Sequence, residues 1–464
     1  MPFFSRTDLS TRFPGEALVA MQRDPLGTFE RMAATGGALV EAQMGPHPFF
    51  LLTDPELVKE LLTTPTDAFT KSPVLRRTRI FLGDGLLTSE NPIHRRHRRL
   101  ILPAFHYTRL QEYAATMVEH ASRLGDRLRE GEVFALDRTM MEVTLEIAGE
   151  TLFGAHVEGV ATAVGRAMET TMDMFRRRMM NPLSDWLLRL PLPGSLRLRR
   201  AHAELDRVVY GIIRARRSDP VERTDLLALL LAAQDEETGD ALSDSEVRDE
   251  VMTLFLAGHE TTANALTWTW LLLAEHPEVE ARLHAEVDAV LGDRQATFED
   301  VKRLPYTRQV FSEAMRLYPP AWAVSRQAVR DTVLGGHRIA AGSVIAFSPY
   351  VLHRDARLWT DPKQFNPDRF ASDAEIKRHK FAFIPFSAGP RGCIGEQFAW
   401  TEGILVTATL AQRWQLRRTD DAPIPLYPSV TLRPGRPIPV VARRREPAEP
   451  IETATRAGQP EPAA

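Results

Sequence analysis

The sequence is poor in cysteine, since Cys393 is the only one among 464 residues. A single cysteine cannot form an intrachain disulfide, so the chain suits a reducing compartment. It supplies too few sulfur ligands for an iron–sulfur cluster, and no closely spaced cysteines and histidines indicate a zinc site. The formal net charge is only −3, so no global excess of positive charge favours nucleic acid as a partner.

The N-terminus lacks a long apolar run. Residues 1–24 carry charged side chains at intervals instead, namely Arg6, Asp8, Arg12, Glu16 and Arg23. The segment therefore predicts neither a signal peptide nor a membrane anchor, and we expect a soluble protein of the cytoplasm. The apolar content of 44% and the charged content of 26% are ordinary for a globular protein.

The one cysteine lies in a loop rich in glycine, residues 386–395, just before a helical pattern. Glycines let the backbone turn sharply and pass close to a large, flat group. Backbone N–H groups and the helix dipole are expected to lower the pKa of the Cys393 thiol and to suit a metal-bound sulfur. Arg391 supplies a fixed cation for a carboxylate. From these residues alone, a buried structural cysteine and a thiol nucleophile both stay open as alternatives.

The pattern Phe-x-x-Gly-x-Arg-x-Cys-x-Gly resembles the haem-ligand loop of the cytochrome P450 family, the haem-thiolate monooxygenases. The resemblance implies that Cys393 is the axial ligand of the iron in haem b (iron protoporphyrin IX), and that the neighbouring residues contact this cofactor. Those neighbours are Phe386, Gly389, Arg391 and Gly395. It also implies a mainly α fold with a small β region, a two-lobed single domain that encloses haem. We expect this domain over residues 1–442 and a disordered tail over residues 443–464.

A second motif lies within a long helix expected from residue 243 to residue 275. Its later half is apolar nearly all round, which predicts burial, yet its middle contains Glu260 and Thr261. A buried carboxylate is costly without a partner or a task. The stretch Ala-Gly-His-Glu-Thr-Thr that begins at Ala257 resembles the family's oxygen-activation motif. The resemblance implies that Thr261 and Glu260 deliver protons and that Ala257 contacts the haem.

A basic helix is expected from residue 91 to residue 105. His94 and Arg98 are four residues apart and share one helix face, and such crowded cations repel each other unless anions meet them. The resemblance implies that His94, Arg98 and, further along, Arg326 bind the haem propionates. Their neighbours are expected to face solvent and a redox partner: Arg95, Arg96 and Arg99.

Three further residues predict a structural ion-pair triad. Glu313 and Arg316 are three apart on one helix, and Arg369 follows in Phe-Asn-Pro-Asp-Arg-Phe. A carboxylate held between two guanidinium groups locks a loop through bidentate hydrogen bonds. By resemblance, this triad holds the segment that presents Cys393.

The implied activity is the insertion of one oxygen atom from O2 into a lipophilic small molecule, by hydroxylation or epoxidation. The chain has no second cysteine for an iron–sulfur cluster and no room for a flavin domain. Two electrons are therefore expected from a separate ferredoxin or flavodoxin with its NAD(P)H reductase. A peroxygenase and a haem-binding sensor or carrier are the alternatives, although a peroxygenase typically lacks the acid–threonine pair.

The substrate class is only loosely indicated. Five methionines between residues 168 and 180 suggest an adaptable apolar surface over the substrate, which suits a terpenoid, a fatty acid or a polyketide. Arg76, Arg77 and Arg79 are either exposed cations or partners of a substrate carboxylate. The sequence fixes neither the substrate nor the oligomeric state.

Overall fold

The computed structural model describes residues 4–6, 16–44, 47–64, 67–154, 192–219, 225–234, 241–371 and 377–445, with a few single residues between positions 170 and 239. The predicted methionine surface over residues 168–180 lies outside the described residues. So does most of the predicted tail, although its first residues belong to a strand, β13 (Pro439–Arg444).

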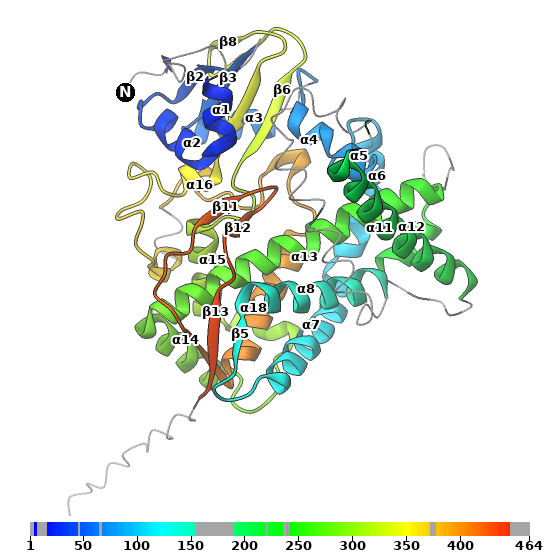
Figure 1. The fold of residues 1–464 in the computed structure, drawn as a ribbon, viewed down its shortest axis with the longest axis vertical. Coiled ribbons are helices and arrows are strands. Elements are labelled where there is room, and N and C mark those ends of the chain that lie inside the picture. The colour runs from blue at the N-terminus through cyan, green and yellow to red at the C-terminus, as the bar shows by residue number, and fades with distance from the viewer. Residues whose placement is uncertain are drawn as a thin grey trace, which may run out of the picture.

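Helices make up most of the described chain, and the longer ones gather in one lobe. Figure 1 shows this lobe below a smaller lobe that holds the main sheet and the helices α1 (Glu16–Arg23), α2 (Pro25–Ala33) and α3 (Pro55–Thr63). The longer ones are α6 (Ile93–Ile101), α7 (Tyr107–Arg127), α8 (Leu136–Phe153), α11 (Pro193–Ser218), α13 (Asp244–Glu275), α14 (Pro277–Val290), α15 (Pro305–Leu317) and α18 (Glu396–Ala411). Besides α1, α2 and α3, the shorter ones are α4 (Pro73–Arg77), α5 (Arg79–Leu82), α12 (Leu226–Ala232) and α16 (Pro349–Leu352). Short 3-10 turns are η1 (Leu102–Phe105), η2 (Phe298–Arg303), η3 (Pro367–Phe370), η4 (Lys380–Ala382) and η5 (Gly389–Arg391).

The small lobe is built on a six-stranded mixed sheet of order β1-β2-β3-β9-β6-β4. Its strands are β1 (Phe4–Arg6), β2 (Leu39–Gln43), β3 (Pro48–Leu52), β9 (Val344–Phe347), β6 (Val324–Ala328) and β4 (Phe69–Lys71). The hairpin expected from the sequence is confirmed, because β2 pairs antiparallel with β3, with Val40 opposite Leu51. Strands from residues 4–71 and from residues 324–347 meet in this sheet, so segments far apart in the sequence join in the small lobe.

Three smaller sheets complete the β structure. Strand β13 pairs antiparallel with β10 (Trp414–Arg418) and β5 (Val133–Ala135). The other two sheets are hairpins, β7 (Thr332–Leu334) with β8 (His337–Ile339), and β11 (Leu426–Pro428) with β12 (Leu432–Pro434). The β11–β12 hairpin extends between the sheet lobe and α13 in Figure 1, a position that matters for the site.

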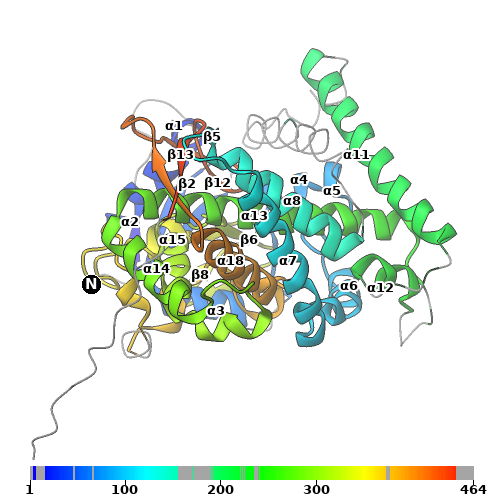
Figure 2. The same cartoon turned by 90° about the horizontal axis from the view of Figure 1, so that it is seen from below.

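The long helix α13 begins and ends where the sequence predicts. The Ser243 hydroxyl and the Glu246 side chain form the expected capping box, and His276 caps the other end before a proline. Its contacts with α8, α15 and α18 form the centre of the large hydrophobic core. Figure 2 shows α13 crossing the body of the molecule, while α11 projects from it.

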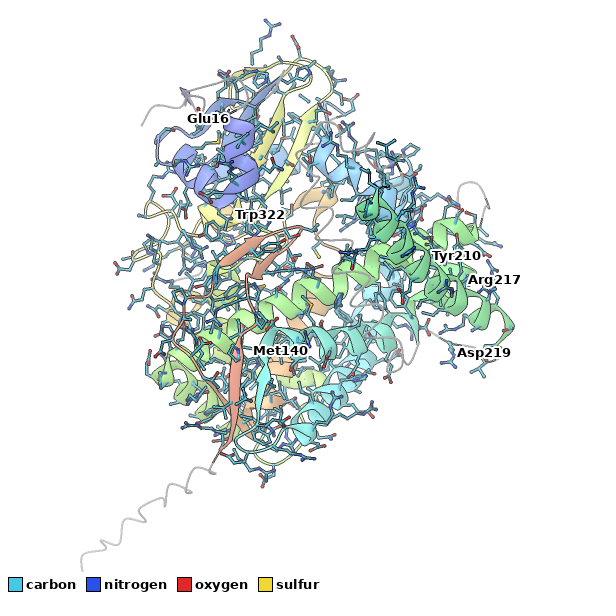
Figure 3. All side chains as sticks on the ribbon, in the orientation of Figure 1. Glu16, Met140, Tyr210, Arg217, Asp219 and Trp322 are labelled. Atoms are coloured by element: carbon cyan, nitrogen blue, oxygen red, sulfur yellow. The ribbon has the colours of Figure 1, made fainter. Side chains whose placement is uncertain are left out.

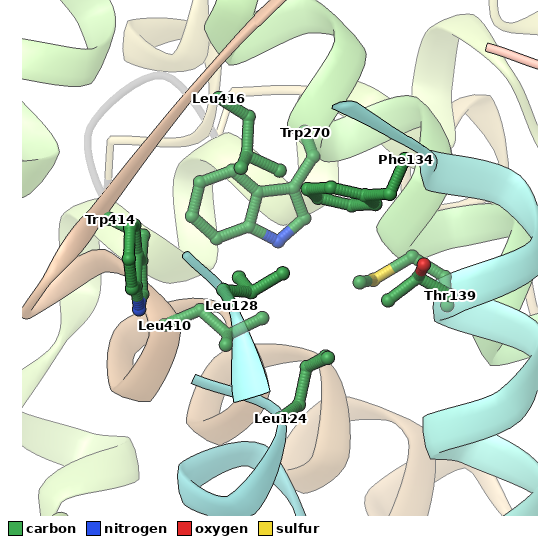
Figure 4. Close-up of a pocket in the computed structure, with 9 residues that line it drawn as sticks. Leu124, Leu128, Phe134, Thr139, Trp270, Leu410, Trp414 and Leu416 are labelled. Atoms are coloured by element: carbon green, nitrogen blue, oxygen red, sulfur yellow. The ribbon is translucent and has the colours of Figure 1, made fainter. Parts of the chain in front are cut away.

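Packing in the core is close. Met140 of α8 lies inside the helical lobe in Figure 3, and Trp322 lies at its junction with the sheet lobe. A cavity of about 10 Å³ lies between α7, α8, α13 and the α18–β10 segment, lined by Leu124, Trp270 and Leu410 among others (Figure 4). It is apolar and about the size of one water molecule, so it is a packing gap rather than a ligand site.

Candidate functional site

The loop that carries Cys393 has a tightly fixed backbone. Gly389 has φ +71°, and a Cβ atom there would lie 2.1 Å from the carbonyl oxygen of Leu62 at the end of α3. Only glycine fits this position. The amide of Cys393 donates to the carbonyl oxygen of Phe386 at 2.9 Å, and α18 begins at Glu396 directly after the loop. The sulfur is therefore presented from a rigid turn at a helix start, as the sequence predicts.

The side chain of Cys393 is not part of the packed core. Its side chain is exposed by area, yet protein surrounds it closely enough that burial raises the pKa of Cys393 to about 11. The Gly395 amide and the Arg98 charge act in the opposite direction but do not outweigh burial. The expected lowering of this pKa is therefore wrong for the thiol itself, because the desolvation of a thiolate exceeds the effect of nearby donors. A bound metal ion reverses this balance, since a coordinating thiol is deprotonated.

Five basic side chains gather beside this loop: Lys71, His94, Arg98, Arg326 and Arg391. Arg98 donates to the carbonyl oxygen of Gly392 at 2.8 Å, which ties α6 to the cysteine loop. Arg391 pairs with Glu90 at 2.6 Å. The structure thus brings together all four predicted propionate-binding cations from three separate segments.

Lys71, at the end of β4, is a member of this cluster that the sequence analysis missed. It is buried, and its ammonium group donates to the carbonyl oxygen of Leu86 at 2.9 Å. No spacing or motif around Lys71 marks it in the sequence. Only the pairing of β4 with β6, which sets Lys71 opposite Arg326, brings it to the site.

Repulsion within the cluster is visible in the pKa values. Burial and then the charge of Arg391 lower the pKa of Lys71 to about 7 and that of His94 to about 3. The same two causes lower the pKa of Arg326 to about 10. Each of these three groups resists its own charge because it is buried and because its neighbours are cationic, so a bound group with two carboxylates would stabilise the charged forms.

The oxygen-activation motif opens one narrow face of α13. Every residue from Glu250 to Leu273 is buried except Ala257, Gly258 and Thr261. Thr261 lies four positions after Ala257 and three after Gly258, so the three residues share one face of the helix. The Thr261 hydroxyl donates to the carbonyl oxygen of Ala257 at 2.6 Å, within an unbroken helix. This face combines small side chains with one hydroxyl, which suits a large flat ligand beside it.

Glu260 faces another way and has a partner that the sequence analysis missed. Its side chain is 1% exposed, and its Oε1 atom accepts from Arg433 Nε at 2.8 Å and Nη2 at 2.7 Å. The Thr431 hydroxyl donates to the same oxygen. Arg433 and Thr431 belong to the β11–β12 hairpin, so the cost of burying this carboxylate is offset by residues far along the chain.

The predicted triad forms in the buried core. Arg316 donates to both oxygens of Glu313, at 2.6 and 2.7 Å, and Arg369 donates to Glu313 Oε1 at 3.2 Å. Arg316 also donates to the carbonyl oxygen of His353 at 2.6 Å. The His353 ring in turn accepts from the amide of Ile384, just before the cysteine loop. The triad is thereby connected to the segment that presents Cys393.

Not all of the arginines expected to face solvent on α6 do so. Arg95 is exposed on α6, but Arg96 pairs with Glu246 at 2.9 Å and Arg99 is half-buried. The expectation of three solvent-facing arginines therefore holds only for Arg95, because α6 packs its other basic residues toward α13 and the loop. Two of the arginines considered for a substrate carboxylate are also engaged, Arg76 with Gln327 and Arg79 with Asp84.

The described residues fit the haem that the motifs imply. The cation cluster has five basic side chains and one paired carboxylate, that of Glu90. The Cys393 side chain is exposed by area, and α13 has one open face of small residues. These are the features that two propionates, an iron atom and a flat macrocycle require. A metal ion would stabilise the ionised form of Cys393, and the carboxylates of a ligand would stabilise the charged forms of the basic cluster.

Comparison with known proteins agrees with this geometry. The model of the family Cytochrome P450 matches residues 13–440. The chain therefore belongs to the cytochrome P450 family and is a monooxygenase whose cofactor is haem.

Individual proteins of this family are similar to the chain over most of their length. The chain is 40% identical over 423 residues to cyclooctatin synthase of Streptomyces melanosporofaciens, covering 91% of this chain and 92% of that protein. It is 36% identical over 406 residues to pentalenene oxygenase of Streptomyces avermitilis, covering 87% and 89%. The crystal structure of the cytochrome P450DA heme domain superposes with a TM-score of 0.85 at 28% identity, covering 96% of this chain and 98% of that one.

None of the described helices is both long and apolar enough to cross a bilayer.

Proposed function

We propose that this cytochrome P450 oxygenates a cyclic terpene or terpene alcohol. The support is the likeness to pentalenene oxygenase and to cyclooctat-9-en-7-ol 5-monooxygenase, which is 38% identical over 400 residues and whose name specifies an unsaturated alcohol. A fatty acid is the weaker proposal, because a carboxylate substrate would need a free cation, and Arg76 and Arg79 already have partners.

The observation that carries this substrate class is an apolar cluster of four segments. Phe81 of α5 and Leu198 of α11 are packed together, with Val74 of α4 and Val430 of the β11–β12 turn against them. These side chains offer no hydrogen-bond donor or acceptor. Phe81 and Leu198 are already buried, so a hydrocarbon skeleton would gain free energy by covering the apolar area that the half-buried Val74 and Val430 leave exposed.

The cofactor is proposed to be haem b, with Cys393 as its axial ligand. The cation cluster of Lys71, His94, Arg98, Arg326 and Arg391 would hold the propionates. Gly389 and Gly395 would allow the backbone to approach the ring, and Phe386 would pack near the sulfur. Ala257 would border the opposite face. The haem, when bound, supplies oxygen activation with electron donation from the thiolate.

The protein's own contribution is position and proton handling. Thr261 would orient a proton donor with its hydroxyl, and Glu260 would hold and release the proton. The apolar cluster would exclude water and fix which carbon of the substrate lies nearest the reacting centre. This acid–threonine pair favours O2 with two electrons over direct use of peroxide.

The electron donor is proposed to be an acidic ferredoxin or flavodoxin with its NAD(P)H reductase. Arg95 is exposed on α6, the helix that Arg98 ties to the cysteine loop. A donor docked there would lie close to the loop that presents the sulfur. Opposite charges across such a surface mainly raise the association rate.

The test is a binding and turnover screen. Ferric Soret shifts are measured with a panel that contains pentalenene, cyclooctat-9-en-7-ol, other cyclic terpenes, and fatty acids of matched size. Ligands that shift the band are then incubated with NAD(P)H and surrogate ferredoxin and flavodoxin pairs. We expect shifts and oxygenated products with terpenes. Shifts and products with fatty acids alone would overturn the terpene assignment.

A further inference from the structure

Glu260 is bound by only one of its two oxygens. Its Oε1 atom accepts from Arg433 and from Thr431, whereas Oε2 is buried and has no hydrogen-bond partner. A purely structural buried ion pair in this chain looks different. In the triad, both Glu313 oxygens accept from Arg316. Burying an acceptor without a partner costs free energy, so the bare Oε2 atom needs an explanation.

The orientation of the bound oxygen is set by a hydrogen-bond network. Asn264 Nδ2 donates to the Thr431 hydroxyl at 3.1 Å and to the carbonyl oxygen of Glu260 at 2.9 Å. Since the Thr431 oxygen accepts from Asn264, its hydrogen is directed to Glu260. The carboxylate is therefore held in one rotamer, with Oε2 directed away from these partners.

The hairpin that supplies these groups is itself fixed at both sides. Trp268 of α13 donates its indole N–H to the carbonyl oxygen of Leu432 at 3.2 Å, and Trp322 donates to that of Ser429 at 2.9 Å. The amide of Leu432 donates to the carbonyl oxygen of Pro320 at 3.0 Å. Val430, next to Thr431, is the residue that meets the apolar cluster. The hairpin thus joins the proposed substrate region to the acid on α13.

We propose that Arg433 and Thr431 are positioning residues that hold Glu260 for proton transfer, with Oε2 as the atom that takes up the proton. Arg433 balances the charge of the resting carboxylate. Oε2 takes a proton from a water molecule connected to solvent and passes it toward Thr261, after which Glu260 is again ionised. This inference rests on the proposed proton role of Glu260 and Thr261 and adds the residues that prepare it.

The proposal is tested with Arg433→Met, Arg433→Lys, Thr431→Val and Glu260→Gln. The control is Arg436→Met, because Arg436 also lies in the C-terminal segment but pairs with Asp420. The probe is whichever terpene of a panel including pentalenene and cyclooctat-9-en-7-ol the wild type converts fastest. Three quantities are measured: product per NAD(P)H, hydrogen peroxide per NAD(P)H, and the solvent deuterium isotope effect on turnover.

We expect Arg433→Met to lower product per NAD(P)H at least threefold, with a matching rise in peroxide and a larger isotope effect. Arg433→Lys should restore part of the yield, and Arg436→Met should match the wild type. Because the residues act as a unit, adding Arg433→Met to Glu260→Gln should cost nothing further. The proposal would be overturned if Arg433→Met gave the wild-type product per NAD(P)H. It would also be overturned if Arg433→Met lowered the yield by the same factor in the Glu260→Gln variant as in the wild type.

Two results separate this inference from the proposed function. If Glu260→Gln lowers the yield and Arg433→Met does not, the positioning role fails while the proton role stands. If Glu260→Gln leaves the yield unchanged, both fail. The ion pair is checked on apoprotein: Arg433→Met should lower the unfolding temperature and Glu260→Gln/Arg433→Met should regain it. The conservative Arg433→Lys and Thr431→Val variants keep the test decisive if Arg433→Met does not fold.

Discussion

At the scale of single residues, the site gathers groups whose charged forms are disfavoured within the protein. Burial, and then the charge of Arg391, lower the pKa values of Lys71 and His94, and burial of Cys393 disfavours its thiolate. Each of these costs is removed by a ligand with an anionic edge and a metal centre. This protein therefore keeps the charge balance of its site incomplete until its cofactor is bound.

Thr261 carries the first residue-scale prediction. Replacing Thr261 by Ala removes the hydroxyl that faces the open side of α13 but leaves the helix intact, since alanine is a good helix former. We expect an unchanged haem spectrum and NAD(P)H consumption, with most electrons diverted to hydrogen peroxide. A single acid–base group contributes about 10²- to 10⁴-fold, so the loss of product should be large.

The measurement is product formed per NAD(P)H consumed. Thr267→Ala is a suitable control, because the Thr267 hydroxyl makes the same bond, to the carbonyl oxygen four residues earlier, on a buried face of the same helix. Equal product yields in the wild type and in Thr261→Ala would contradict the assigned role.

Many residues of the site could be predicted from the sequence, but only those whose interactions lie within one short stretch of the chain. Three features are local in this sense: the cysteine loop, the capping box of α13 and the Glu313–Arg316 pair. Within each of them the interacting residues are close in the sequence, and the structure forms the expected geometry. Arg433 and Lys71 could not be found this way. Arg433 lies 173 positions from Glu260, and Lys71 reaches the site only through strand pairing. The raised pKa of Cys393 depends on burial, which no motif encodes.

At the scale of elements, buried polar pairs fasten the helices to each other. The triad joins α15 to the segment before the cysteine loop, with the Glu313 and Arg316 side chains fully buried. Removing one member of such a pair leaves an uncompensated charge in the core. We propose that these contacts hold the site in place rather than take part in its chemistry.

Glu313→Gln tests this holding role. It leaves Arg316 and Arg369 without their carboxylate, and we expect the free energy of unfolding to fall by about 3 kcal/mol or more. Haem should also be lost more readily, because the cysteine loop is no longer fixed. The control is Glu299→Gln, which breaks an exposed pair with Lys302 at the same spacing and should change stability little. Similar denaturant midpoints for the two variants would argue against the role of the triad.

A second element-scale prediction concerns pH. His120 of α7 lies 2.8 Å from Glu150 and 3.3 Å from Glu146, both on α8. Burial disfavours the imidazolium, but the two carboxylates outweigh it and raise the pKa of His120. A raised pKa in the folded state contributes stability that is complete below the unfolded value of about 6.5 and is lost as pH rises through the folded value.

The expected result is a stability difference between wild type and His120→Asn that is largest near pH 6 and shrinks above it. Unfolding by urea at several pH values measures this difference. His106→Asn, at the exposed start of the same helix, should show no such trend. A difference that grew with pH would contradict the charged pairing of His120.

At the scale of the whole molecule, the chain has one surface where electrons are expected to enter. The two lobes meet around α13, and α6 lies at the edge of the large lobe with Arg95 exposed (Figure 1). Arg98 ties this helix to the cysteine loop. An acidic donor that binds here would lie on a helix that contacts the loop of the proposed thiolate ligand directly.

Arg95→Glu tests the docking surface. We expect slower haem reduction by an acidic ferredoxin at low ionic strength, and a wild-type rate that falls as salt screens the attraction. Substrate-induced Soret shifts should be unchanged. Arg129→Glu, at an exposed position just after the end of α7, serves as the control for charge alone. A reduction rate insensitive both to salt and to Arg95→Glu would show that α6 is only a solvated helix.

The central claim is that Cys393 binds the haem iron through its thiolate. The most direct measurement is the absorption spectrum of the reduced carbon monoxide adduct, recorded for the wild type and for Cys393→Ala after haem reconstitution of both. The wild type should absorb at the wavelength typical of thiolate ligation. Cys393→Ala should lack that band entirely. A thiolate-type band in Cys393→Ala, or its absence in the fully reconstituted wild type, would contradict the assignment of this site.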